Sequence, residues 1–169
     1  ASIALERVGI KVDKYYASEI EQFAIDITQK NYPNTIQLGD VFNIDYSKLD
    51  KIDLLIGGSP CTYWSSARAK DTGRELTPNG IGGQLFMQYV KALKETKPKY
   101  FLYENNNSMS KEIKQFITKQ LGVEPIMINS ALVSGQIRRR LYWTNIPVKE
   151  FPKDKNIKLI DVLEKKVDD

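Results

Sequence analysis

Four reactive side chains each follow a short, mostly apolar segment of the sequence. They are Glu19, Asp40, Cys61 and Glu104. If those segments are parallel strands, their carboxyl ends lie at one edge of the sheet, which is where open α/β sheets bind ligands. The sequence therefore predicts three carboxylates and a thiol along one edge.

Cys61 comes directly after Gly57-Gly58-Ser59-Pro60. The glycines allow the backbone to approach a ligand closely, and the proline restricts the backbone just before the thiol. A loop cysteine near helix amides or arginines could react as a thiolate. The alternative is a small buried hydrophobic residue, which is the commoner role of a free cysteine.

Glu19 and Asp40 are of the right chemical type to bind a nucleoside. A carboxylate at the end of a strand can accept hydrogen bonds from both hydroxyls of a ribose, and a second one can accept from an adenine amino group. Two simpler interpretations stay open. Glu19 could only place a negative charge in the first turn of a helix, and Asp40 could be a turn residue.

Glu104 follows the aromatic segment 100–103, where its carboxyl group could contact a substrate ring or point into water beside a turn built on residues 105–107. Further along the chain, Gln136, Arg138 and Arg140 alternate into a predicted strand, which places both arginines on one face. Paired guanidinium groups suit a phosphate or a base carbonyl, but charged side chains also protect an exposed edge strand.

The composition narrows the possible chemistry. The chain has 169 residues, enough for one domain with one core, and 41% of them are apolar. With one cysteine and no histidine, an internal disulfide, the usual zinc ligand sets and imidazole-dependent triads are excluded, and we expect no metal. The net charge of +4 suits a polyanion, although many proteins that bind none carry a similar charge. No apolar run is long enough for a membrane span and no signal peptide is evident, so we expect a cytoplasmic protein that does not bind membranes.

Helical and strand patterns alternate along the chain. Helices are expected over residues 2–8, 19–31, 84–95, 111–121 and 159–165, and strands over 12–17, 35–38, 52–56, 100–103, 125–128 and 140–144. Within 19–31, Ile20, Phe23, Ala24 and Ile27 form the apolar face of an amphipathic helix. This order predicts an α/β fold with a mostly parallel sheet and helices on both faces. The polar, glycine-rich segment 71–83 is predicted to be a long surface loop, and such loops are often functional.

Three motifs together resemble the DNA cytosine-5 methyltransferases of phage and bacterial type, which include restriction-modification enzymes. The motifs are Gly58-Ser59-Pro60-Cys61, Glu104-Asn105 and Gln136-Ile137-Arg138-Arg139-Arg140, in the order and approximate spacing of that family. The resemblance covers nearly the whole chain and implies a Rossmann-like methyltransferase fold that uses S-adenosylmethionine. It also implies that residues 1–169 are one partial catalytic domain. The first strand with its glycine-rich cofactor loop would precede Ala1, and the target-recognition region would follow Asp169.

The resemblance implies a covalent mechanism on double-stranded DNA. A cytosine is flipped out of the helix, and the Cys61 thiolate adds to carbon 6 of its ring. Carbon 5 then takes the methyl group, and loss of its proton expels the thiolate. Glu104 would hold the ring nitrogen and amino group, Arg140 would bind the base carbonyl or orient Glu104, and Arg138 would support the site.

Further roles follow from the same resemblance. Cofactor binding is expected from Glu19, Asp40, Val41, Pro60 and Leu85, and substrate binding from Ser59, Ser65, Asn105 and Gln136. The loop 65–83 resembles the one that closes over the flipped base. This chain departs from the family at Asn106, where a branched aliphatic residue is usual, and at Thr62 after Pro-Cys.

Three other functions remain possible from the sequence. The chain could be a non-catalytic remnant or regulatory subunit of the same fold, or a related enzyme that methylates cytosine in transfer RNA. A nicotinamide-dependent Rossmann enzyme is disfavoured, because the chain contains no Gly-x-Gly-x-x-Gly.

Overall fold

The computed structural model describes residues 2–66 and 73–164. By their internal contacts the residues divide into two compact units, Ala1–Lys51 and Ile52–Asp169. Each unit is described by itself. No helix in the described ranges is long and apolar enough to cross a membrane.

The first unit is built on a pair of short parallel strands. Its elements are α1 (Ser2–Arg7), β1 (Tyr15–Ala17), α2 (Gln22–Asn31), β2 (Thr35–Gln37) and two 3-10 turns, Val41–Asn43 and Tyr46–Lys48. β1 pairs with β2 in parallel, with Tyr15 opposite Thr35. Gly9 ends the α1 segment with a φ of 72°, a left-handed conformation that glycine adopts at little cost.

The helix predicted over residues 19–31 is found as α2, but most of its apolar face is exposed. The helix begins at Gln22 rather than at residue 19, and Phe23 and Ile27 are 83% and 64% exposed. Ile20, before the helix, is 69% exposed. Ala24 and Ile25 are partly buried instead. The periodicity marked an apolar stripe correctly, but two three-residue strands can cover only part of a helix, so the stripe is not buried inside this unit.

The second unit contains a four-stranded sheet in the order β3-β4-β6-β5. Its strands are β3 (Leu54–Gly57), β4 (Tyr100–Asn106), β5 (Ile126–Asn129) and β6 (Arg139–Thr144). β3 and β4 are parallel, while β6 is antiparallel to both β4 and β5. Three of the four strands therefore run in one direction, as predicted, and β6 is inserted in the opposite direction between two of them.

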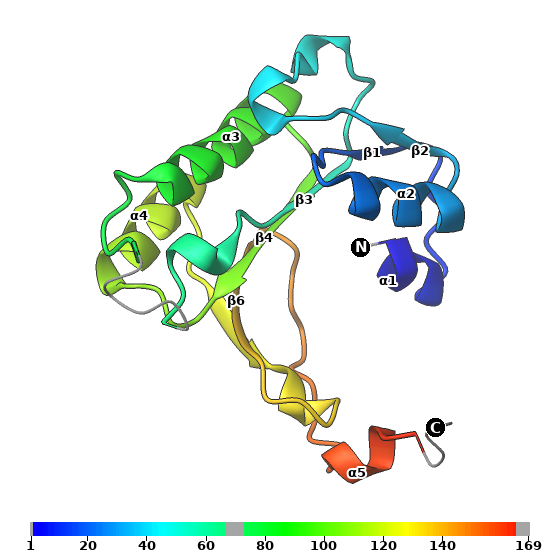
Figure 1. Cartoon of the computed structure of the whole chain (residues 1–169), viewed down its shortest axis with the longest axis vertical. Coiled ribbons are helices and arrows are strands. Elements are labelled where there is room, and N and C mark those ends of the chain that lie inside the picture. Colours follow the sequence, from blue (N-terminus) through cyan, green and yellow to red (C-terminus); the bar gives the residue numbers. More distant parts are fainter. Residues whose placement is uncertain (1, 67–72, 165–169) are drawn as a thin grey trace. The chain divides into compact units, whose positions relative to one another are not determined.

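Two helices cover one face of this sheet. α3 (Ile81–Thr96) and α4 (Lys111–Leu121) lie on the same side of β4 and β6 (Figure 1). They bury alternate strand residues, Phe101 and Tyr103 from β4 and Leu141 and Trp143 from β6. The Tyr103 ring lies 5.1 Å from the ring of Phe86 on α3 and 5.9 Å from that of Trp143. The expected helical cover is thus found on one face, and the opposite face presents Glu104 and Arg140.

Two boundaries differ from the sequence prediction in ways that affect the candidate site. β4 continues to Asn106, so Asn105 and Asn106 are strand residues, only 1% and 3% exposed, and not a turn in water. α3 begins at Ile81 rather than at residue 84, and Gly82 and Gly83 in its first turn are buried. A Cβ on Gly82 would lie 2.5 Å from the indole nitrogen of Trp64, and one on Gly83 would overlap the Pro78 carbonyl. Close packing, and not loop flexibility, explains these glycines.

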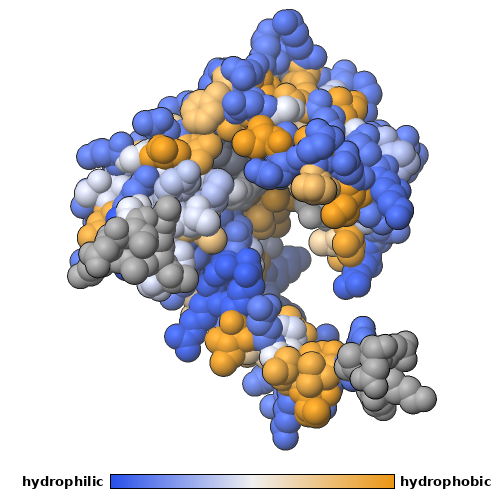
Figure 2. Space-filling view, in the orientation of Figure 1, coloured by the Kyte–Doolittle hydropathy of each residue, from blue (hydrophilic) through white to orange (hydrophobic). Residues whose placement is uncertain are grey.

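The helix α4 agrees with its prediction at both ends. Ser110 accepts a hydrogen bond from the Ile113 amide at 3.2 Å, and Gly122 ends the helix with a φ of 70°. The last helix, α5 (Leu159–Val162), is shorter than expected, and residue 165 lies outside the described ranges. Apolar side chains gather at the surface over α5 (Figure 2), where Leu159 and Ile160 are 61% and 68% exposed.

Candidate active site

Cys61 lies on a loop that runs against the end of β4. A Cβ on Gly58 would meet the backbone oxygen of Glu104 at 2.8 Å and its carboxylate Oε2 at 3.4 Å, so only glycine allows this approach. Pro60 then precedes a 3-10 turn that begins at Cys61. The Cys61 side chain is free and partly exposed, which contradicts the alternative of a fully buried hydrophobic residue.

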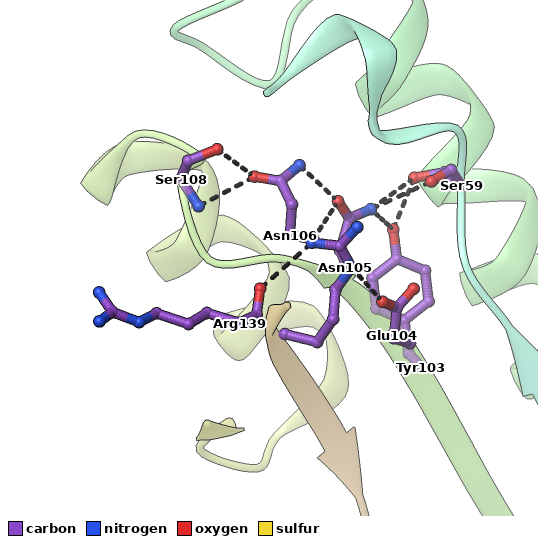
Figure 3. Close-up of polar contacts among 8 residues, drawn as sticks. Ser59, Tyr103, Glu104, Asn105, Asn106, Ser108 and Arg139 are labelled. Atoms are coloured by element: carbon purple, nitrogen blue, oxygen red, sulfur yellow. Dashed lines mark hydrogen bonds and ion pairs between the residues drawn. The ribbon is translucent and has the colours of Figure 1, made fainter. Parts of the chain in front are cut away.

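Hydrogen bonds from β4 hold the residue before Pro60-Cys61. The Ser59 and Tyr103 hydroxyls lie 2.6 Å apart, and Asn105 Nδ2 donates to the Ser59 carbonyl at 3.1 Å and to the Tyr103 hydroxyl at 3.2 Å (Figure 3). Burial raises the pKa of Tyr103. Its hydroxyl therefore stays neutral at physiological pH and can both donate and accept.

Glu104 and Arg140 form an ion pair on the opposite face of β4. Arg140 Nε donates to Glu104 Oε1 at 2.8 Å, and the two side chains are 16% and 34% exposed, respectively. Side chains alternate along a strand, so Glu104 points away from the face that carries Tyr103 and Asn105. One carboxylate oxygen is oriented by a guanidinium group, and the other is available to a ligand in this half-exposed position.

Tyr142 is a residue of this face that the sequence analysis missed. It lies opposite Glu104 in the β4–β6 register. Burial, then the negative charge of Glu104, raises the pKa of Tyr142, while Arg140 and Arg138 act against the increase. The signal was present, because Arg138, Arg140 and Tyr142 alternate and should share a face.

Arg138 and Gln136 are less tightly placed. Both are exposed and precede β6. The Arg138 amide donates to Asn129 Oδ1 at 3.1 Å, and the Gln136 carbonyl accepts from the Ser130 hydroxyl at 2.9 Å. The structure thus joins Arg140 to Glu104 directly, whereas the interaction found for the Arg138 side chain is an electrostatic effect on Tyr142.

A second missed residue, Glu75, ties the Cys61 loop to α3. The buried Trp64 donates its indole N–H to Glu75 Oε2 at 3.1 Å, and the Gly82 amide donates to the same oxygen at 3.1 Å. Leu85, predicted to line the cofactor site, is partly buried and lies in the first turns of α3. Ser65 is partly buried, and its amide donates to the Cys61 carbonyl at 2.8 Å. Part of the predicted closing loop, residues 67–72, lies outside the described ranges.

The predicted cofactor carboxylates lie together in the first unit. Glu19 follows β1 and Asp40 follows β2, and the Ser18 hydroxyl donates to the Gly39 carbonyl at 2.7 Å, which joins the two strand ends. Glu19 Oε1 accepts from the amides of Ile20 and Glu21 at 2.8 and 3.1 Å. Because α2 begins only at Gln22, the interpretation of Glu19 as a first-turn residue is wrong.

Asp40 has a local structural role as well. Its Oδ1 accepts from the Phe42 amide at 3.0 Å and so caps the 3-10 turn that begins at Val41. This agrees with the simpler interpretation of Asp40 as a turn residue, and the second carboxylate oxygen is left for another partner. Glu19 also lines an open cavity of about 280 Å³ within the first unit.

The family of the chain follows from comparison with known proteins. The family model for C-5 cytosine-specific DNA methylases matches residues 1–157. The chain belongs to that family. Within the described part of the chain, no group of three or more acidic, cysteine or histidine side chains could hold a metal ion.

The curated relatives are phage and bacterial methyltransferases. The chain is 32% identical over 155 residues to the orphan methyltransferase M.SPRI of Bacillus phage SPR, a match that covers 85% of this chain and 34% of M.SPRI. It is 27% identical over 157 residues to the type II methyltransferase M.NgoBV of Neisseria gonorrhoeae, covering 93% of this chain and 36% of that protein. The chain therefore spans about a third of the length of these relatives.

A solved structure shares the fold. It is a crystal structure of a DNA modification methyltransferase encoded within an E. coli prophage, with a TM-score of 0.63 and 23% identity. The likeness covers 85% of this chain and 42% of that one. This confirms the predicted Rossmann-like methyltransferase fold.

Proposed function

We propose that this chain is the catalytic region of an enzyme that transfers a methyl group from S-adenosylmethionine to carbon 5 of cytosine in double-stranded DNA. The observation that carries the proposal is the close approach of the Cys61 loop to Glu104, whose carboxylate Arg140 orients at 2.8 Å. A thiol, a carboxylate and a guanidinium group at one strand end are the groups that covalent catalysis on cytosine needs. Membership of the cytosine-specific methylase family supports the same reaction.

The first unit offers suitable groups for the cofactor. Glu19 keeps Oε2 for the ribose hydroxyls while backbone amides fix Oε1, and Asp40 can accept from the adenine amino group. Val41 would supply an apolar contact in this unit, and Pro60 and Leu85 of the second unit stay predictions from the family resemblance. When bound, S-adenosylmethionine supplies an electrophilic methyl group.

The residues of the second unit would activate the base. Cys61 adds to carbon 6 of the flipped cytosine, and Glu104 holds the ring nitrogen and amino group so that the ring accepts this addition. Arg140 keeps Glu104 oriented, and Arg138 adds positive charge beside the site. Ser59 and Asn105 hold the loop, and Ser65 and Gln136 would contact the substrate strand. After carbon 5 has taken the methyl group, loss of its proton would expel the Cys61 thiolate and restore the aromatic ring.

We place this reaction in the cytoplasm of a bacterial or phage-infected cell. The relatives come from bacteria and their phages, and DNA is the substrate class that the family name states. The net charge of +4 favours association with a polyanion.

Covalent trapping tests the proposal. The chain is incubated with S-adenosylmethionine and duplex DNA that contains 5-fluorocytosine, which blocks proton release and traps the adduct, and the adduct is mapped by peptide mass analysis. We expect a DNA adduct on Cys61, the only cysteine of the chain. Cys61→Ser should form none, and Glu104→Gln should form it at least about 100-fold more slowly, as expected for loss of a group acting on the reacting ring.

The controls separate the competing functions. Transfer RNA that contains 5-fluorocytosine is tested in parallel, and an adduct on RNA but not on DNA would contradict the proposed substrate. An adduct that forms equally well with Cys61→Ser would refute the nucleophile. Formation of no adduct on either nucleic acid would favour the non-catalytic alternative.

A further inference from the structure

Three polar side chains at the end of β4 form a continuous run of hydrogen bonds (Figure 3). Asn105 Oδ1 accepts from Asn106 Nδ2 at 3.1 Å, and Asn106 Oδ1 accepts from the Ser108 hydroxyl at 2.8 Å and from its amide at 2.9 Å. Asn105 and Asn106 are almost fully buried. Low dielectric surroundings strengthen such a chain of bonds and make each partner costly to remove.

The two ends of this run hold the two ends of the Cys61 loop. At one end, Asn105 Nδ2 donates to the Ser59 carbonyl at 3.1 Å. At the other end, the Ser66 amide donates to the Ser108 hydroxyl at 3.0 Å. Cys61 lies between Ser59 and Ser66, so the segment that carries the thiol is attached to β4 on both sides.

Ser108 also contacts Arg74, which precedes it by 34 residues. Its carbonyl accepts from Arg74 Nη2 at 2.7 Å. The hydroxyl, amide and carbonyl of Ser108 are therefore all engaged, and Asn106 is the residue that fixes the direction of the hydroxyl. A branched aliphatic side chain at position 106, which is usual in the family that the sequence resembles, could not do this.

We propose that Asn106 and Ser108 are positioning residues that fix Cys61 for attack on the base. The inference rests on the proposed function, in which Cys61 is the nucleophile. Asn106 and Ser108 act through the loop 59–66 and do not touch the substrate. Because a displacement of about 1 Å can cost on the order of 100-fold in rate, the direction in which the loop holds the thiol matters for the reaction.

The first test uses the free protein and needs no catalytic activity. Ser108→Ala removes the acceptor of the Ser66 amide, while Ser108→Thr keeps a hydroxyl as the matched control. We expect amide hydrogen exchange at Ser66 to rise roughly five- to tenfold in Ser108→Ala, the change that loss of one such hydrogen bond gives, and to stay within about twofold in Ser108→Thr. The rate of Cys61 alkylation by iodoacetamide should change in Ser108→Ala and return in Ser108→Thr.

The second test uses trapping on 5-fluorocytosine DNA. We expect Ser108→Ala and Asn106→Val to slow adduct formation at saturating DNA by roughly tenfold, with Ser108→Thr near wild type. The dissociation constant of S-adenosylmethionine should stay the same in all variants. This control shows that the variants are folded, because a general loss of folding would also weaken cofactor binding.

The outcomes separate this inference from the proposed function. Unchanged Ser66 exchange and unchanged Cys61 alkylation in Ser108→Ala would overturn the inference whatever the activity. Faster exchange with an unchanged trapping rate would also overturn it, because the contact would then be structural only. If the wild-type chain forms no adduct, the proposed function fails, and the alkylation rates alone decide whether Ser108 positions the thiol.

Discussion

The ion pair between Glu104 and Arg140 should contribute measurably to the stability of the second unit. The perturbation is a double-mutant cycle of Glu104→Gln, Arg140→Leu and both together. The bond joins Nε and Oε1 at 2.8 Å, the length of a charge-assisted hydrogen bond. Such bonds contribute about 1.5–3 kcal/mol, and the one-third exposure of Glu104 lowers our expectation to a coupling energy of about 1–1.5 kcal/mol.

Tryptophan fluorescence gives a suitable assay. Both tryptophans, Trp64 and Trp143, are fully buried in the second unit, so their emission during urea unfolding follows that unit and not the first. Free energies of unfolding of the wild type and the three variants yield the coupling energy. Glu124→Gln serves as a control for an exposed carboxylate on the same unit, and it should change the free energy by less than about 0.5 kcal/mol.

A coupling energy below about 0.3 kcal/mol, within the usual error of additivity, would refute the reasoning. The carboxylate and guanidinium groups would then not interact in solution as they do in the structure. Arg140 would lose its assigned role of orienting Glu104.

Three other predictions concern the same unit. Gly83→Ala should destabilise it by roughly 1–3 kcal/mol or more, because the new methyl group meets the Pro78 carbonyl, and a urea midpoint equal to wild type would contradict this. The free energy of unfolding should fall as the pH rises above about 10, the ordinary tyrosine pKa. Burial raises the pKa of Tyr89 and Tyr103 in the folded state, so the unfolded chain ionises first. Tyr89→Phe should make this fall shallower, and an identical slope would exclude Tyr89 as a source of the pH dependence. Glu104→Gln should lower the pKa of Tyr142, because it removes a neighbouring negative charge, and NMR titration of labelled tyrosine rings would reveal an unchanged value if the two groups do not interact.

Much of the local structure could be predicted from the sequence because its causes are local. Ser110 and Gly122 define the two ends of α4 by capping, and the predicted range agrees with the observed one. The position of the Cys61 loop after β3 likewise follows from Gly57 and Gly58, which end the strand. The three motifs identified the family, and the family model agrees.

The length of β4 could not be predicted, because it depends on a partner far away in sequence. Asn105 and Asn106 are poor strand residues by composition, but β6 pairs with them and places Leu141 and Arg140 opposite. Pairing and burial override the local preference for a turn. The same pairing gives Glu104 its guanidinium partner.

Exposure of α2 is the reverse case. The spacing of its apolar residues shows that they share one face of the helix, but whether that face is buried depends on what packs against it. In the first unit the two short strands leave most of that face exposed.

The sequence by itself determined the reactive residue types, their order, and the alternation of helices and strands, because these depend on side-chain chemistry and on periods of two and 3.6 residues. Only the tertiary structure decided which side chains meet. It paired Glu104 with Arg140, and it linked Asn106 to Ser66 through the Ser108 hydroxyl. Contacts between residues tens of positions apart depend on strand register and close packing.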